Sequence, residues 1–260
     1  KYSNNKKLIE KNKKIKFLSI IGMGGSILGS KAIYDFLKYK IKKEITFHDN
    51  LVSNSKIYKK NINIVVSKSG NTLETIANAN VLIKNKQKNI FITESHNSYL
   101  RSLAFKIKAD IVNHNNFIGG RYSVLSEVGM LPAEFMGLSE KKFKQFNNLI
   151  KNKKFINLLI SNVSSILFFI KNKKFNSIIL NYDSSSHNLF MWYQQLIAES
   201  LGKKGKGILP MISSMPKDNH SLMQFYLDGP RNNFFTFFHV KEKKVLKNNN
   251  NEILQSYNYL

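Results

Sequence analysis

Short apolar runs alternate with segments of helical periodicity along most of this 260-residue chain, and this alternation constrains the fold more than any other feature. Short apolar strands that alternate with helices are typical of a parallel sheet covered by helices on both faces. The sequence therefore predicts an α/β fold. We expect strands at residues 16–23, 44–49, 61–68, 89–95, 109–114, 176–182, 207–213 and 233–240, and helices at 27–40, 72–86, 98–107, 187–201 and 219–228.

The apolar runs fall into two groups, which indicates two lobes. One group lies before the sequence Gly-Leu-Ser-Glu at residues 137–140, and the other follows amphipathic segments between residues 140 and 171. We expect a first lobe over residues 1–138 and a second over 139–260, each a largely parallel sheet flanked by helices in three αβα layers. Because the chain begins with Lys1 rather than Met and ends without a clear terminal element, we expect a fragment that lacks residues at both ends.

Composition excludes several kinds of site. Hydrophobic residues make up 42% of the chain, enough for a core, and the absence of cysteine excludes disulfides and thiol chemistry. The six histidines include no pair spaced four residues apart, so we expect no metal site. We find no signal peptide, and serine and asparagine interrupt the apolar segment at residues 158–170. We therefore expect a cytoplasmic protein without a membrane span.

The net charge of +25 is compatible with nucleic-acid binding or with an anionic small substrate. Only Arg101, Arg121 and Arg231 among the 41 basic residues are arginines, whereas base readout relies heavily on arginine. The lysines occur with asparagines in short clusters spread over the whole chain, not in one patch. We therefore expect no nucleic-acid partner.

The first glycine-rich stretch, residues 20–30, follows an expected strand and precedes an expected helix. It fails the dinucleotide fingerprint because Ile27 stands in place of the third glycine. It also fails the triphosphate loop, because Ser30 and Lys31 stand in reversed order. What remains is a strand, a glycine-rich turn and a helix start, which suit either a bound anion or a tight turn without ligand.

A second strand-to-helix junction carries the hydroxyl residues Ser67, Ser69 and Thr72. Asn71, with Glu74 three residues later, predicts a helix N-cap with a capping-box partner. In open parallel sheets, ligands bind outside the carboxyl ends of the strands. The two junctions are therefore expected to converge on one phosphate, although capping alone would also explain these hydroxyls.

Three later positions carry groups suited to catalysis. Arg121 directly follows two glycines, a setting in which a guanidinium can reach an oxyanion. Gln195 and Glu199 lie one turn apart at the margin of an apolar helical stripe, and His220 lies at the start of an expected helix. An exposed surface glutamate and a helix-capping histidine would give the same pattern.

Taken in order, these stretches resemble the phosphoglucose isomerase family, whose members have the two-lobed sugar isomerase (SIS) fold. Several of the matches lie in the first lobe and two in the second, and their common order makes the resemblance more specific than any single motif. The matching segments are Gly24-Gly25-Ser26, Ser67-Lys68-Ser69 through Thr72, Gly119-Gly120-Arg121-Tyr122-Ser123, Glu199-Ser200-Leu201-Gly202-Lys203, and the histidine segment at residues 217–230, which contains His220.

The resemblance implies interconversion of glucose 6-phosphate and fructose 6-phosphate through a cis-enediol, in glycolysis and gluconeogenesis, without a cofactor. It implies that Glu199 is the base, that Arg121 stabilises the enediolate and that His220 opens the sugar ring. In the family this histidine comes from a neighbouring subunit, so a homodimer is implied. The substrate-binding positions implied are Gly25, Ser26, Ser67, Lys68, Ser69, Thr72, Gly120 and Gln195.

One family feature has no counterpart. A lysine that assists ring opening lies in a C-terminal Gln-x-Gly-Val-Glu-x-Gly-Lys motif, which does not occur before Leu260. We expect it to lie in a missing part of the protein. A dual phosphoglucose and phosphomannose isomerase, an amino-sugar phosphate isomerase and a non-catalytic SIS sugar-phosphate sensor remain as alternatives.

Overall fold

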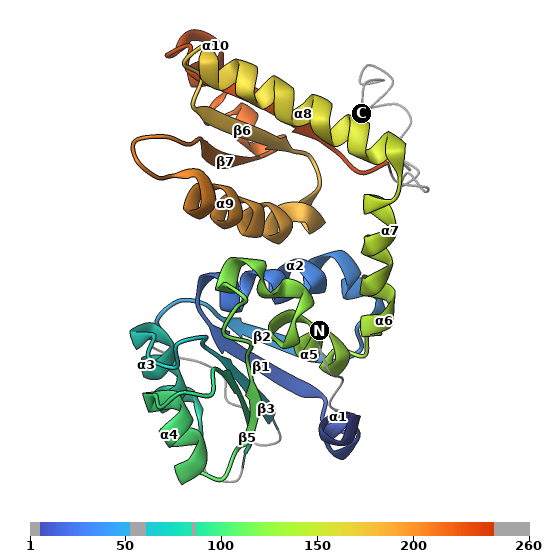
Figure 1. Ribbon diagram of the computed structural model, residues 1–260, viewed down its shortest axis with the longest axis vertical. Helices are drawn as coiled ribbons and strands as arrows, with labels where there is room; N and C mark the ends of the chain where they lie inside the picture. The colour runs from blue at the N-terminus through green and yellow to red at the C-terminus, as the bar shows by residue number, and fades with distance from the viewer. Residues whose placement is uncertain (1–5, 53–60, 85–86, 242–260) are drawn as a thin grey trace, which may run out of the picture.

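The computed structural model describes residues 6–52, 61–84 and 87–241. Two layered lobes lie one above the other, and short helices connect them along one side (Figure 1). The described parts contain two separate sheets, and every strand pair in both is parallel. The predicted α/β fold is confirmed.

The first lobe is built on a five-stranded sheet of order β2-β1-β3-β4-β5. Its central strands are buried on both faces, as the continuous apolar runs predict. In the register of the two central strands, Gly22 pairs with Val66, so the segments that follow both strands leave the same sheet edge. The strands are β1 Phe17–Gly22, β2 Glu44–His48, β3 Asn61–Val66, β4 Lys88–Thr93 and β5 Asp110–Asn113.

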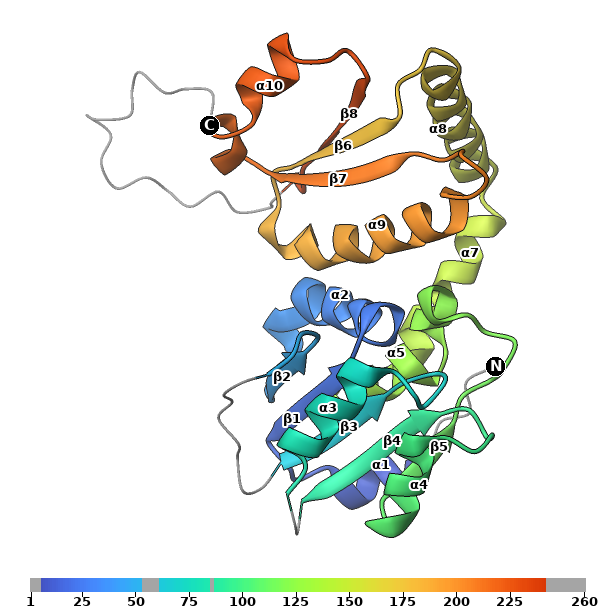
Figure 2. The ribbon, with the colours of Figure 1, turned by 90° about the vertical axis from the view of Figure 1, so that its left-hand side faces the viewer.

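Helices cover both faces of this sheet (Figures 1 and 2). On one face, Ile20 and Ile64 pack in a core with Leu131, and on the other, Val65 and Phe91 pack with a second set of helices. Successive strand residues point to opposite faces, so the central strands contribute to both cores, whereas the edge strand β2 contributes Ile45 and Phe47 to the first. The first face is covered by α1 Lys6–Asn12, α2 Leu28–Leu37 and α5 Glu127–Phe135, and the second by α3 Leu73–Leu82 and α4 Tyr99–Lys106.

The second lobe is built on a three-stranded sheet of order β7-β6-β8. One of its helices, α9, lies between this sheet and α2 of the first lobe (Figure 2). Phe169 of α8 stacks on Phe234 of β8, with ring centroids 4.9 Å apart. The elements are β6 Asn176–Asn181, β7 Leu209–Ser214, β8 Asn233–Phe238, α8 Lys153–Lys171, α9 His187–Leu201 and α10 Met223–Asp228; α6 Glu140–Phe143, η4 Lys144–Phe146 and α7 Asn147–Ile150 connect the lobes.

The predicted elements occur in the predicted order, with two differences at helix starts. Thr72, not Asn71, is the N-cap of α3, because the Asn71 side chain instead accepts a hydrogen bond from the backbone of Tyr99, at 2.9 Å. The helix expected from residue 219 begins at Met223 and follows a separate 3₁₀ turn, η6 Lys217–Asn219. The division of the chain at residues 138 and 139 stays a prediction.

Helix α8 corrects one expectation. An 18-residue window of this 19-residue helix has a mean hydropathy of 1.4, which makes the helix long and apolar enough to cross a membrane by length and composition, and none of that window is buried. The prediction from interruption by serine and asparagine was wrong on this point, because leucine, isoleucine and phenylalanine outweigh them. A single helix of this kind does not establish a membrane protein, since core helices and signal sequences meet the same criteria.

Candidate functional site

Residues that break the two nucleotide-binding templates contribute to the fold. Ile27 is fully buried in the core of the first lobe. Lys31 points toward β2, where its Nζ lies 2.6 Å from Oδ2 of Asp49. A lysine held in this ion pair is turned toward the second strand and not toward the glycine-rich turn, so the turn does not form a triphosphate loop.

Two glycine motifs pack directly against each other. They are η1 Gly24–Ser26, after β1, and η3 Gly120–Leu125, after β5. A Cβ atom added to Gly25 would lie 2.5 Å from the backbone nitrogen of Arg121, so only glycine permits this contact. The hydroxyl of Ser123 donates to the carbonyl oxygens of Gly25, at 3.3 Å, and Gly120, at 2.5 Å. These contacts hold the loop that carries Arg121 against the end of β1.

Arg121 meets Glu199 of the second lobe at this junction. Its Nη1 donates to Oε1 of Glu199 at 2.7 Å, and its Nε donates to the hydroxyl of Ser200 at 2.9 Å. Gln195, one turn earlier on α9, donates to the other carboxylate oxygen of Glu199 at 3.2 Å. The arginine side chain is 18% exposed and that of Glu199 is 53% exposed, so solvent and small ligands reach the carboxylate.

Tyr122 and Ser200 form hydrogen bonds beside the Arg121–Glu199 pair. Both lie within the sequence motifs, but the sequence alone assigned them no role. The Tyr122 hydroxyl and the Ser200 hydroxyl lie 2.9 Å apart. Hydrogen bonds to Ser200 and then to Arg121 lower the pKa of Tyr122. A hydrogen bond with Tyr122 and, to a smaller extent, the charge of Glu199 raise the pKa of Arg121, so the guanidinium stays cationic.

The hydroxyl loop after β3 forms a compact turn beside η1. The hydroxyls of Ser67 and Thr72 lie 3.0 Å apart, and Ser69 accepts a hydrogen bond from the backbone N–H of Asn71 at 3.2 Å. Lys68 Nζ donates to the carbonyl oxygen of Asn116 at 2.9 Å and lies 3.4 Å from Glu94. Within the described residues, no hydrogen bond or ion pair links this loop to Arg121 or Glu199.

Two polar side chains at the junction are available to a ligand. The Oε1 atom of Gln195 is buried and has no hydrogen-bond partner among the described residues. Gln195 also lies close to Gly24, where an added Cβ would come within 2.8 Å of its Nε2. The hydroxyl of Ser26 likewise makes no hydrogen bond within the described part of the chain. A buried unpaired oxygen is costly unless a ligand or water satisfies it.

His220 does not join this group. It is exposed, follows η6, and in the described chain makes no side-chain hydrogen bond or ion pair. Its neighbour Asp218 is used locally, accepting hydrogen bonds from the Ser214 backbone at 2.7 Å and the Ser213 hydroxyl at 3.1 Å. The next helix, α10, lies at the end of the second lobe farthest from the first (Figures 1 and 2).

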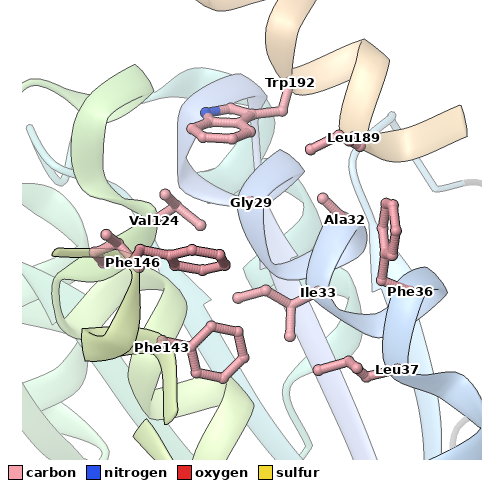
Figure 3. A pocket seen from close by; sticks show the side chains of 11 residues that line it. Gly29, Ala32, Ile33, Phe36, Leu37, Val124, Phe143, Phe146, Leu189 and Trp192 are labelled. Carbon is pink, nitrogen blue, oxygen red and sulfur yellow. The ribbon is translucent and has the colours of Figure 1, made fainter. Parts of the chain in front are cut away.

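An apolar cavity of about 430 Å³ lies between α2 and α9, where the lobes meet (Figure 3). Its walls include Phe36, Leu189 and Trp192, and no charged side chain of the described residues lines it, so it is unsuited to a sugar phosphate. The indole N–H of Trp192 donates to the backbone carbonyl of Arg121 at 3.0 Å. The wall of this cavity is thus bonded to the loop that carries the arginine.

The structure defines an α/β protein of two parallel-sheet lobes, with Arg121 of the first lobe paired to Glu199 of the second. A family model for phosphoglucose isomerase matches residues 7–209. The chain belongs to the phosphoglucose isomerase family.

Relatives named glucose-6-phosphate isomerase support this family membership. The chain is 34% identical to the glucose-6-phosphate isomerase of Methanocaldococcus jannaschii, over 87% of this chain and 60% of that protein. It is 35% identical to that of Mycoplasmopsis pulmonis, over 96% of this chain and 65% of that protein. The chain therefore spans somewhat less than two thirds of the length of these relatives.

Solved structures show the same fold. A hypothetical protein from Thermus thermophilus superposes with a TM-score of 0.75 at 23% identity, over 98% of this chain and 67% of that chain. A glucose-6-phosphate isomerase from Chlamydia trachomatis superposes with a TM-score of 0.67 at 20% identity, over 86% of this chain and 50% of that chain. At these identities the comparison establishes the fold alone.

We predict that Gly25→Ala lowers the free energy of unfolding, because its methyl group overlaps the backbone of Arg121. Overpacking of this kind costs about 1–3 kcal/mol. Gly120→Ala is the matched control on the other side of the same contact, since no described atom lies within 4 Å of an added Cβ there. Urea denaturation of the two variants checks this; equal stabilities would contradict the close approach of the two motifs.

Proposed function

We propose that the protein is an aldose–ketose isomerase that interconverts glucose 6-phosphate and fructose 6-phosphate through a cis-enediol. The observation that carries the proposal is the Arg121–Glu199 pair, 2.7 Å apart, at the edge where η1 and the hydroxyl loop leave the first sheet. Membership of the phosphoglucose isomerase family and relatives named glucose-6-phosphate isomerase support it.

Glu199 is the proposed base. Its carboxylate takes the proton from C2 of the open-chain aldose and returns it to C1, while the carbonyl moves from C1 to C2 and a hydroxyl proton moves between the two oxygens. One carboxylate is enough, because the proton leaves and returns on the same face of the enediol. Gln195 holds one carboxylate oxygen, which fixes the plane of the group.

Arg121 is the proposed electrostatic stabiliser. Negative charge develops on the substrate oxygens only as the enediolate forms, so a fixed cation beside them stabilises the transition state more than the ground state. In the structure this cation contacts Glu199 and Ser200. A substrate between the two side chains would take over the guanidinium and leave the carboxylate free to act as a base.

The hydroxyl loop is the proposed phosphate site. Ser67, Ser69 and Thr72 provide hydroxyls, and the ten-residue helix α3 begins directly after them, so its unpaired N–H groups favour an anion. Lys68 adds positive charge beside the loop. The loop lies beside η1, so a phosphate there would place the sugar chain toward Gly25 and Ser26, on the way to Gly120 and Arg121.

His220 is the proposed ring-opening residue, supplied by a second copy of the chain. Within the described residues of one chain its side chain makes no hydrogen bond or ion pair with Arg121 or Glu199, which supports a histidine supplied by another subunit. We therefore propose a homodimer with shared sites. A cytoplasmic location and a place in glycolysis and gluconeogenesis belong to the same proposal.

We predict that Glu199→Gln lowers kcat at least about a hundredfold, the lower range for acid–base catalysis, because the amide cannot accept the C2 proton. A coupled assay of fructose 6-phosphate conversion with the native protein measures this. Glu44→Gln, at an exposed position of β2, is the matched control and keeps full activity. An active Glu199→Gln variant would contradict the assignment of the base, and inactivity of the unaltered protein would favour a sugar-phosphate sensor.

Subunit mixing tests the shared site. Glu199→Gln and His220→Ala are each inactive, but a mixed dimer holds one site with both residues intact. Random reassociation in a twofold dimer restores about a quarter of the native activity. Unfolding and refolding the two variants together, followed by the same assay, checks the prediction. No recovery, although mixed dimers form, would mean that His220 acts within its own chain or not at all.

A further inference from the structure

His114 and Glu127 form a buried pair at the base of the loop that carries Arg121. His114 directly follows β5 and is 3% exposed, and Glu127 is the first residue of α5 and is 9% exposed. The Nδ1 atom of His114 is hydrogen-bonded to Oε1 of Glu127, and its Nε2 lies 3.1 Å from the carbonyl oxygen of Ile118. The proposed mechanism assigns no role to either residue.

The hydrogen-bond partners determine where the protons lie. The carbonyl oxygen of Ile118 can only accept, so Nε2 of His114 must donate. Oε1 of Glu127 also accepts from the backbone N–H of Asn115 at 3.2 Å, and the start of α5 favours a negative charge there. Oε1 of Glu127 therefore binds both Nδ1 of His114 and the backbone N–H of Asn115, and three hydrogen bonds hold the pair in place.

The electrostatics of Glu127 favour its ionised form. Burial alone would raise the pKa of Glu127, but hydrogen bonds from His114 and from backbone N–H groups outweigh burial and lower it. A folded-state pKa below the ordinary value means that the carboxylate stabilises the fold above the usual titration range of glutamate. That contribution is lost as pH falls through the lowered pKa.

Lys68 and Arg101 approach the segment around the pair, and Lys68 donates to the carbonyl oxygen of Asn116 at 2.9 Å. A cavity of about 630 Å³ borders the pair, and among the described residues that line it Tyr122 is the one other titratable side chain. From α4, Arg101 donates to the side chain of Asn113, at 2.9 Å, and to the carbonyl oxygen of Glu94, at 3.1 Å. That cation is already bonded to other groups beside the pair.

The pair ties three parts of the structure together: the end of β5, the start of α5 and the carbonyl of Ile118. Ile118 lies three residues before Arg121. At the other end of the loop, the hydroxyl of Ser126 donates to the carbonyl oxygen of Ser123 at 2.7 Å. The segment between these anchors presents the guanidinium to Glu199.

We propose that His114 and Glu127 are positioning residues for Arg121, holding its loop at the place where the guanidinium meets Glu199; this rests on the proposed isomerase function. The pair acts through the loop: among the described residues it makes no hydrogen bond or ion pair to Glu199 or to the hydroxyls of Ser67, Ser69 and Thr72, although Lys68 reaches the carbonyl oxygen of Asn116 beside it. Its removal should therefore impair the stabilisation of the enediolate and leave the binding of the phosphate intact.

Glu127→Gln tests the proposal, because it removes the charge and keeps the size of the side chain. We expect kcat to fall on the order of ten- to a hundredfold, the effect of a small misplacement of a catalytic group, with KM for fructose 6-phosphate little changed.

Glu140→Gln is the matched control. Glu140 is also a buried first residue of a helix, α6, and its partner Lys144, at 2.8 Å, lies outside the arginine loop. It should leave kcat unchanged. A Glu127→Gln variant that is less stable but turns over normally would overturn the proposal.

A second readout does not depend on turnover. Trp192 is the single tryptophan in the chain, and its indole N–H donates to the carbonyl oxygen of Arg121. Its proton–nitrogen NMR signal should shift and exchange faster with solvent in Glu127→Gln, and stay unchanged in Glu140→Gln. A shifted signal in a protein that never isomerises fructose 6-phosphate would leave the positioning role standing and sink the isomerase function. An unshifted signal would sink the positioning role.

If Glu127→Gln does not fold, nitrogen NMR of the histidines in the unaltered protein tests the positioning role instead. The expected result is that Nε2 of His114 carries hydrogen, as the carbonyl oxygen of Ile118 requires. A His114 Nε2 without hydrogen would overturn the proposal, because the pair would then not hold the loop at Ile118.

Discussion

The ion pair between Arg121 and Glu199 joins the two lobes, and the geometry of the site depends on it. Arg121 comes from a loop of the first lobe and Glu199 from α9 of the second, so neither lobe holds the site alone. The contact requires α9 to pack on α2 and requires a glycine at position 25, where a side chain would displace the arginine loop. The carboxylate and guanidinium that the proposed chemistry needs are thus held together by backbone packing.

Much of the fold could be predicted from the sequence, and so could the residues of the candidate site. Buried parallel strands read as continuous apolar runs, and the junctions after β1 and β3 fall at one sheet edge because parallel strands end on the same side. The failure of Ile27 and Lys31 to match nucleotide templates proved informative: one is a core residue and the other pairs with Asp49. The structure brings Arg121, Gln195 and Glu199 together, while their catalytic roles stay predictions.

What the sequence did not disclose depends on contacts between distant residues. The buried His114–Glu127 pair joins positions 13 residues apart across a loop, and no local periodicity marks such a partner. Asn71 suited an N-cap by residue type, but the backbone of Tyr99 competes for its side chain. The apolar surface of α8 could be seen in composition, whereas its exposure could not. His220 lies apart from the other candidates. It follows η6, the turn after β7 in the second lobe, and spacing along the sequence does not reveal that position.

The most direct test of the account is a crystal structure of the protein with fructose 6-phosphate bound. The account predicts the phosphate group on the hydroxyl loop of residues 67–72, with C1 and C2 of the sugar between the guanidinium of Arg121 and the carboxylate of Glu199. Glu199 should then contact the substrate carbon chain in place of Arg121. A phosphate bound directly to Arg121, or a sugar that leaves the Arg121–Glu199 pair closed, would contradict it.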